Sequence, residues 1–184
     1  GGPLCTPSRA AMLTGRYASR YGLGAGVVFP GFIDHDTMEL PASPDHGLPP
    51  DEETVASVLS RAGYDTKHIG KWHLGSEPPY RPIDHGFDSY YGLPYSNDMY
   101  TSEGEPDMER WVNVPEKMVR PDHPHPHAIH YDFPDLPLYR DGEIVEQPVD
   151  QTRLTSTYTE EAVSFLEGRA DDDPFFLYLS HNMP

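Results

Sequence analysis

Apolar residues recur every three to four positions in two stretches of the chain, which is the spacing of a helix with one buried face. Residues 51–62 begin with three acids, which favour the first turn of a helix, and continue with apolar residues on one face. Gly63 follows as a stop signal. Residues 152–169 give the clearest helical pattern. Their apolar face consists of Leu154, Tyr158, Ala162, Phe165 and Leu166.

A third, shorter helix is predicted near the start of the sequence. Thr6 is a suitable N-cap and Pro7 a suitable first helical residue, because proline has no N–H to leave unpaired there. Gly15 is expected to end the helix. Cys5 would then lie just before a helix N-terminus, where backbone N–H groups favour negative charge.

Short apolar runs between these helices predict strands. Residues 64–69 and 175–179 are such runs, and we expect the second to be a buried strand. Residues 138–146 resemble a hairpin that turns at Asp141-Gly142, a good two-residue turn signal. Helices that alternate with short apolar strands indicate the α/β class.

Three stretches lack regular patterns and are expected to be loops. Residues 21–50 are rich in Gly, Pro and Asp, and residues 70–96 are interrupted by Gly and Pro around an apolar patch at 87–93. Residues 102–137 hold many prolines and are interpreted as an irregular insertion.

The charge of the chain narrows its possible partners. It has 13 basic and 30 acidic residues and a net charge of −17, with a mean hydropathy of −0.63. Such a balance disfavours nucleic acid and anionic membranes as partners, because both need basic surfaces. A small anionic substrate stays possible, since the field in a cleft can oppose the net charge. The single cysteine excludes an internal disulfide and is either a buried structural thiol or a reactive group.

Three motifs in order carry a family resemblance. Residues 5–16, C-T-P-S-R-A-A-M-L-T-G-R, resemble the sulfatase signature C-x-P-S-R-x-x-x-x-T-G-R without departure. Residues 63–75, which end in G-K-W-H-L-G, look like the second sulfatase signature. Residues 92–98, G-L-P-Y-S-N-D, are similar to the segment that follows in arylsulfatases of the A type. The resemblance covers most of the chain and is weakest over residues 102–148.

This resemblance implies an alkaline-phosphatase-like α/β sandwich, with a central, largely parallel sheet and helices on both faces. It also implies hydrolysis of sulfate monoesters of aryl groups or sugars. In the family, a maturation enzyme oxidises the cysteine to formylglycine before folding, and the aldehyde becomes a geminal diol. One hydroxyl of the diol attacks sulfur and the other helps to expel sulfate, so that one difficult step becomes two easier ones.

Four further residues take roles by resemblance. Arg9 lies one turn along from Cys5 and would steady the diol and the nearby metal. Lys71 would contact the diol and the sulfate oxygens. His73 would bond the spare hydroxyl and act as the base that releases sulfate, a role that suits a near-neutral pKa. Ser96 resembles the serine that donates a hydrogen bond to bound sulfate.

The resemblance also implies one calcium ion with oxygen ligands. Cys5, as formylglycine, would supply one ligand. The remaining ligands in the family are an Asp pair upstream and an Asp-Asn pair downstream, and neither pair lies in this chain. The downstream lysine and histidine that bind sulfate are absent as well. We therefore expect residues 1–184 to be a fragment of the N-terminal catalytic domain, cut at both ends and inactive by itself.

Several alternatives stay open at this point. Arg16 is interpreted as an ordinary helix charge and His68 as a strand residue. The histidines of residues 123–130 could bind zinc or nickel, but alternating prolines hold them apart, which favours a solvated loop. Relatives with the same motif hydrolyse phosphonate or phosphate diesters, and a non-catalytic sulfatase-like protein is the third possibility. Family habit favours an exported or lysosomal location.

Overall fold

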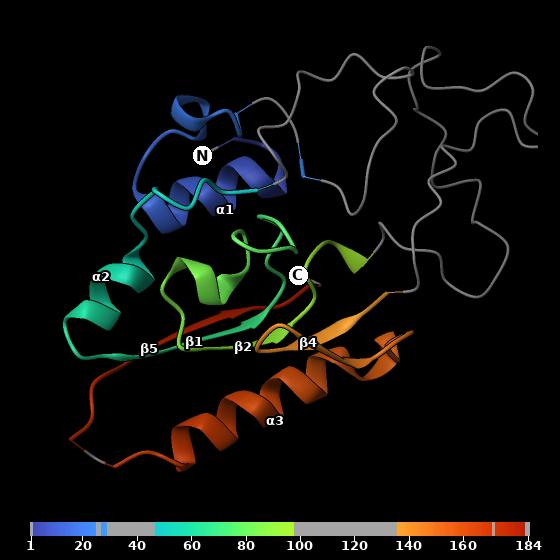
Figure 1. Cartoon of the computed structure of the whole chain (residues 1–184). Helices are drawn as coiled ribbons and strands as arrows, with labels where there is room; N and C mark the ends of the chain where they lie inside the picture. The colour runs from blue at the N-terminus through green and yellow to red at the C-terminus, as the bar shows by residue number, and fades with distance from the viewer. Residues whose placement is uncertain (1, 25–26, 29–46, 98–135, 171, 183–184) are drawn as a thin grey trace, which may run out of the picture.

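A mixed β-sheet lies between two layers of helices (Figure 1). The computed structural model describes residues 2–24, 27–28, 47–97, 136–170 and 172–182. Almost all of the predicted insertion, and the whole histidine-rich segment within it, lie outside the described residues. The strand order in the described sheet is β4 (Glu143–Glu146), β3 (Leu138–Arg140), β2 (Ser89–Gly92), β1 (Asp65–Gly70) and β5 (Phe175–Ser180).

One side of the sheet is parallel and the other is antiparallel. Strand β1 (Asp65–Gly70) pairs in parallel with β2 (Ser89–Gly92) and with β5 (Phe175–Ser180). Strands β3 (Leu138–Arg140) and β4 (Glu143–Glu146) form the predicted hairpin, which is antiparallel to β2. The three parallel strands end at the same edge of the sheet, and the candidate residues Lys71, His73 and Ser96 follow those ends.

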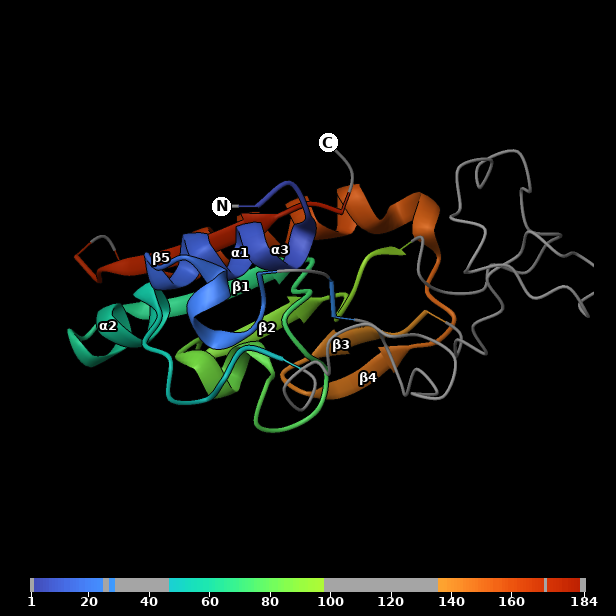
Figure 2. The ribbon, with the colours of Figure 1, turned by 90° about the horizontal axis from the view of Figure 1, so that it is seen from above.

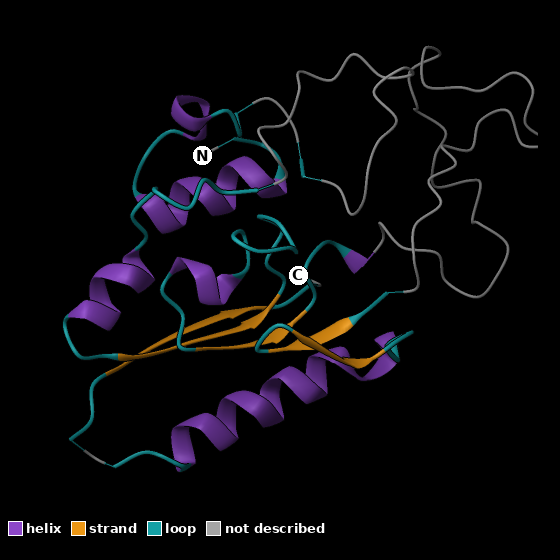
Figure 3. Ribbon diagram, in the orientation of Figure 1, coloured by secondary structure: helices purple, strands orange, loops and turns teal. Residues whose placement is uncertain are grey.

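Helices cover both faces of the sheet (Figure 3). Helices α1 (Cys5–Thr14) and α2 (Val55–Arg61) lie on one face, and α3 (Leu154–Glu167) crosses the other. Seen from above, α1 lies over the region of β1 and β5 (Figure 2). Short 3₁₀ helices occupy Ala18–Tyr21, Pro82–His85 and Gln151–Arg153. No helix among the described residues is long and apolar enough to cross a membrane.

The two faces of the central strands bury different side chains. On the α3 face, Tyr91 packs edge-on against the fully buried Tyr158. On the opposite face, His68 stacks with Tyr90 and lies 5.4 Å from the ring of Phe87. This alternation follows from the two-residue period of a strand, which points successive side chains to opposite faces.

Two predicted helix starts were wrong by a few residues. Helix α1 begins at Cys5 with Leu4 as its N-cap, so Thr6 is not the cap. The hydroxyl of Thr6 is used in a tertiary contact, which overrides its local capping tendency. Helix α2 begins at Val55, capped by Thr54, and the acids at 51–53 precede it. The predicted end of α1 at Gly15 is confirmed, with a φ of 68°.

Three other predictions need correction. The expected loop at residues 70–96 contains β2, because three residues of its apolar patch, Ser89 to Tyr91, pair with β1. Strand β5 is partly exposed rather than buried, with 44% of Phe175 accessible, because nothing described covers its outer side. Leu166 was predicted on the buried face of α3 but is 44% exposed, in the last turn of the helix.

Candidate active site

The candidate site lies where the carboxyl ends of β1 and β5 meet the first turn of α1. Ligand sites in α/β sheets are commonly found at this edge. Gly70 ends β1 with a φ of 106°, and a Cβ there would overlap the carbonyl oxygen of Ser180. Only glycine allows the two strands to approach so closely, and the segment after it therefore turns directly toward α1.

Lys71 joins the three sequence motifs in space. Its Nζ donates to Cys5 Sγ at 3.2 Å and to Ser96 Oγ at 2.6 Å. The lysine is only 5% exposed, whereas Cys5 is partly exposed. The structure thus brings together a thiol from α1, a cation from the end of β1 and a hydroxyl from the segment after β2.

Backbone hydrogen bonds continue past the ends of the strands and fix this segment. The Lys71 N–H donates to the carbonyl of Ser180, and the N–H groups of Trp72 and His73 donate to the carbonyls of Leu93 and Pro94. The chain around Lys71 is therefore held on both sides, as in the interior of a sheet. This pairing holds the segment that carries Lys71 and His73 against the segment that leads to Ser96.

His73 is buried and carries a rare backbone conformation. Its φ is 63°, a left-handed value that is uncommon outside glycine and concentrates at functional sites. The imidazole is fully buried, and Nε2 lies 2.9 Å from the carbonyl oxygen of Val28. Since a carbonyl only accepts, Nε2 carries the proton and Nδ1, which has no described partner, is left as an acceptor.

The pKa of His73 differs from the near-neutral value expected from the sequence. Burial, followed by the positive charge of Lys71, lowers it from 6.5 to about 3. The imidazole is therefore neutral at physiological pH. The ring of Tyr95 packs edge-on against it at 5.8 Å and fixes its orientation.

Arg9 is directed at the strand ends rather than at Cys5. Its Nη1 donates to the carbonyl of Lys71 and to Ser180 Oγ, the latter at 3.1 Å. Within the described residues, neither Arg9 nor Lys71 forms an ion pair with a carboxylate. Two cations without an acidic partner give this edge of the sheet a local positive charge, in a chain whose net charge is −17.

Two residues of the site were not found from the sequence. Thr6 is fully buried, donates to the carbonyl of His73 at 2.9 Å and accepts from the N–H of Val28 at 3.0 Å. Ser180 bonds Lys71 and Arg9. Thr6 lies inside the first signature and was interpreted as a cap. Nothing local distinguishes Ser180, because its partners are 109 and 171 residues away.

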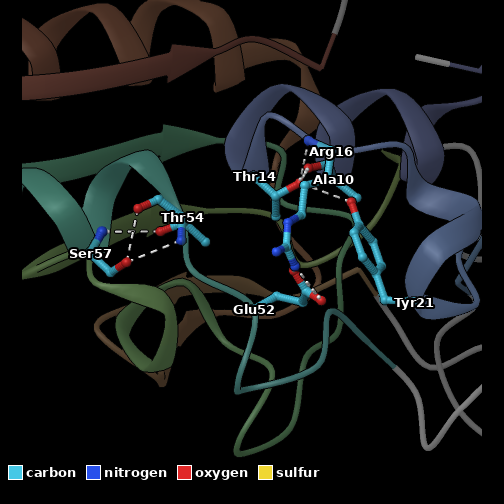
Figure 4. A network of polar contacts seen from close by, with 7 residues as sticks. All are labelled: Ala10, Thr14, Arg16, Tyr21, Glu52, Thr54 and Ser57. Atoms are coloured by element: carbon cyan, nitrogen blue, oxygen red, sulfur yellow. Dashed lines mark hydrogen bonds and ion pairs between the residues drawn. The ribbon is translucent and has the colours of Figure 1, made fainter.

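Arg16 lies at the other end of α1 and takes no part in the site. Its Nη1 pairs with Glu52 at 3.0 Å, beside a hydrogen bond between Thr14 and Tyr21 (Figure 4). The arginine side chain is 55% exposed. The interpretation of Arg16 as a helix charge fits this position. His68 lies in β1, as expected.

The described residues show no metal-binding cluster, and a hollow in their surface lies away from the predicted site residues. Among the residues that the structure describes, no group of three or more His, Cys, Asp or Glu side chains is placed to hold a metal ion. A hollow of about 420 Å³ lies at the opposite, amino end of β1, between Asp65, Phe165 and Arg169. No predicted site residue lines it, and the basic side chain in it is already paired with Asp65.

Comparisons with known proteins agree with the motifs. A family model described as Sulfatase matches residues 1–184. Arylsulfatase G of Canis lupus familiaris is 40% identical over 179 residues, which are 95% of this chain and 30% of that protein. N-acetylgalactosamine-6-sulfatase of Homo sapiens is 32% identical over 186 residues, which are 96% of this chain and 29% of that protein.

A solved structure supports the fold. The crystal structure of Ps i-CgsB in complex with k-i-k-neocarrahexaose aligns with a TM-score of 0.65 and 27% identity, over 100% of this chain and 35% of that chain. The chain thus spans about a third of the length of the proteins it matches. The alkaline-phosphatase-like α/β fold predicted from the sequence is confirmed, with a mixed sheet. The full-length family match and the similarity to two curated sulfatases show that the chain belongs to the sulfatase family.

Proposed function

We propose that this chain provides the nucleophile and part of the sulfate site of an enzyme that hydrolyses sulfate monoesters to an alcohol and sulfate. The observation that carries the proposal is the contact of Lys71 Nζ with both Cys5 Sγ and Ser96 Oγ, in the absence of a described carboxylate partner. A buried cation without a counter-ion is suited to bind an anion, because the anion would complete its charge pairing.

Cys5 is proposed to be oxidised to formylglycine. The surroundings fit this group, since the Cys5 side chain is partly exposed and a protonated amine lies 3.2 Å from its sulfur. As a hydrated aldehyde, the residue supplies one hydroxyl to attack sulfur and a second to help release sulfate. Lys71 would orient the attacking oxygen and the sulfate oxygens together, which lowers the entropic part of the barrier.

His73 is proposed to accept a proton at Nδ1. Its Nε2 proton is held on the carbonyl of Val28, which fixes the tautomer. Burial and the charges of Lys71 and Arg9 lower the pKa of this imidazole to about 3. A bound sulfate ester adds negative charge nearby and raises the pKa of the imidazole, which makes it a better base when substrate is present.

Arg9 and Ser96 complete the described part of the site. Arg9 contributes positive charge and ties α1 to the carbonyl of Lys71. Ser96 Oγ already accepts from Lys71, so its own proton is available for a sulfate oxygen. Calcium is proposed as the metal of the complete site. The described residues do not form a cluster that could hold it by themselves. The remaining ligands are proposed to come from outside residues 1–184.

The substrate is proposed to be an aryl or sugar sulfate. Among the similar proteins, arylsulfatase G and N-acetylgalactosamine-6-sulfatase carry these two chemistries in their names, and the Ps i-CgsB crystal holds an oligosaccharide. The second partner is the enzyme that converts Cys5, which must act on the unfolded chain. No observation in the structure favours a phosphate ester over a sulfate ester.

The experiment starts with full-length protein made together with a formylglycine-generating enzyme. Peptide mass spectrometry across Cys5 is expected to show the aldehyde, and the protein is expected to hydrolyse aryl or sugar sulfates faster than aryl phosphodiesters. The Cys5→Ala variant is the control and should lose turnover. An unmodified thiol, in material where a control sulfatase is fully converted, would contradict the proposal, and preference for the phosphodiester would transfer the site to the related reaction.

A further inference from the structure

A partly buried polar chain of Ser180, His68 and Arg9 lies behind Lys71, and Ser180 belongs to none of the three sulfatase motifs. Ser180 Oγ donates to the carbonyl of Lys71 at 2.8 Å, and the Lys71 N–H donates back to the carbonyl of Ser180 at 2.8 Å. Arg9 Nη1 reaches both the same carbonyl and Ser180 Oγ. His68 Nε2 lies 3.2 Å from Ser180 Oγ. Ser180 is therefore the common partner of His68, Arg9 and Lys71.

The protons of this chain can be assigned by counting. The Ser180 hydroxyl has one proton, which points to the carbonyl of Lys71 because that oxygen cannot donate. Its oxygen must then accept from Arg9 and from His68, so His68 carries its proton on Nε2. The opposite tautomer would leave an N–H at Nδ1, which is buried without a partner, and a buried unpaired donor is costly.

Aromatic packing fixes the histidine in this role. His68 is fully buried between Tyr90, at 5.0 Å between ring centroids, and Tyr178, at 4.8 Å, with both pairs stacked. Burial, and then the charge of Arg9, lower the pKa of His68 well below its ordinary value, so the ring is neutral. A neutral ring held on both faces can present its single N–H in only one direction.

We propose that Ser180 and His68 are positioning residues, which hold the Lys71 backbone and the Arg9 guanidinium in the arrangement that the sulfatase site needs. The inference rests on the proposed function for the meaning of that arrangement. Neither residue touches Cys5 in the described structure, so both act through Lys71 and Arg9. Loss of the Ser180 hydroxyl removes one acceptor from His68 Nε2–H and frees Arg9 from one of its two partners.

The expected kinetic effect follows from what Lys71 contacts. Its Nζ contacts Cys5, the proposed nucleophile position. A displaced lysine would therefore misalign the attacking group, whereas binding of the alcohol part of the substrate would change little. In the full-length, modified protein, Ser180→Ala and His68→Phe should each lower kcat by about tenfold to a hundredfold, with KM changed by less than about threefold. His68→Phe keeps the aromatic stack and removes only the hydrogen bond.

Two variants separate positioning from simple damage to the fold. Ser180→Thr keeps the hydroxyl and should restore kcat to within about threefold of the unmutated protein. Ser164→Ala removes an exposed serine from α3 and is the matched control, with no expected effect. Each variant is assayed well below its melting temperature. If Ser180→Ala and His68→Phe are folded and keep kcat within about twofold, or if Ser180→Thr fails to restore it, the inference is wrong.

A spectroscopic test does not depend on turnover or on mutation. In protein labelled with ¹⁵N-histidine, His68 should show a protonated Nε2 and a bare Nδ1 from pH 5 to 8, and assignment can use the loss of its signals in His68→Phe. A protonated Nδ1, or a charged ring in this range, would overturn the inference. If the unmutated protein hydrolyses no sulfate ester while His68 shows the expected tautomer, the proposed function fails and the hydrogen-bonded chain stands.

Discussion

Lys67 lies in the middle of β1 and Lys71 directly follows the end of the same strand, and both are buried, at 9% and 5% exposure. Their partners are of opposite kinds. Lys67 Nζ pairs with the Glu161 carboxylate at 2.7 Å, and Arg140 binds the same carboxylate through two hydrogen bonds. Lys71 meets a thiol and a hydroxyl, and no described carboxylate pairs with it.

The difference makes Lys67 a structural cation, whereas Lys71 has the charge to bind the proposed substrate anion. Burying a charge is costly unless it is paired, and at Lys67 the pairing is complete within the chain. At Lys71 the described residues supply no carboxylate partner, and the proposed substrate anion would complete the pairing. Four predictions test this comparison.

The largest effect is expected from Lys71→Met. The substitution keeps the length of the side chain and removes the charge next to the nucleophile, so kcat/KM of the full-length modified protein should fall by about a thousandfold. The melting temperature should stay the same or rise, because an unpaired buried cation is removed. Steady-state kinetics and thermal unfolding measure the two effects. Loss of stability with little loss of turnover would assign Lys71 a structural role.

Lys67→Met is the matched substitution, and we expect the opposite result. Glu161 keeps Arg140 but loses its buried partner, so the free energy of unfolding should fall by about 1–3 kcal/mol. Turnover per folded molecule should change by less than about twofold, since the pair lies on the α3 face, away from Cys5. Denaturant unfolding and active-site titration test this. A large drop in kcat would remove the distinction between the two lysines.

The Glu161 cluster should also make stability depend on pH. Hydrogen bonding from Arg140, followed by that from Lys67, lowers the pKa of Glu161 from 4.5 to about 2. Because the folded state favours the carboxylate, the stabilisation is complete above about pH 4.5 and is lost as the pH falls toward 2. After allowance for solvent screening, it amounts to about 1–2 kcal/mol at neutral pH.

This pH dependence is measured as the difference in unfolding free energy between the unmutated protein and Glu161→Gln. The difference should be constant between pH 6 and 8 and should shrink below pH 4. A difference that stays constant down to pH 2.5 would show that the carboxylate is not stabilised by its partners.

The smallest effect is expected from Arg16→Ala. Arg16 lies just after the helix that carries Arg9, and it pairs with Glu52 (Figure 4). The Arg16 side chain is 55% exposed, so solvent screens the pair. The free energy of unfolding should change by less than about 0.5 kcal/mol, and turnover should be unchanged. Arg9→Ala, which removes the contacts with Lys71 and Ser180, is the sensitive counterpart. Equal effects of the two arginine substitutions on kcat would contradict this assignment.

Local signals predicted the elements whose cause is local. The end of α1 follows from Gly15, the hairpin from Asp141-Gly142, and α3 from its spacing of apolar residues. Strand β2 was missed because a four-residue strand between glycines and prolines has too few alternating positions to show a period. Its formation depends on pairing with β1, which is a tertiary effect.

The candidate site shows the same division. Cys5, Arg9, Lys71, His73 and Ser96 were selected because they match motifs, and the structure places Lys71 against both Cys5 and Ser96. The left-handed backbone of His73 and the use of Thr6 as a bridge have no sequence signal, because both follow from the meeting of α1 with the end of β1. The support behind Lys71 comes from β5 and was hidden for the same reason.

The hydrogen bond between Arg9 and Ser180 also determines how early the site can be completed in a newly made chain. The two residues are 171 positions apart, so the bond cannot form until the ribosome has added all the residues between them. At typical rates of about 5–20 residues per second, this takes roughly 10 to 35 seconds. During that interval the surroundings of Cys5 are incomplete, so the enzyme proposed to oxidise this cysteine in the unfolded chain would have a period of access that the topology itself provides.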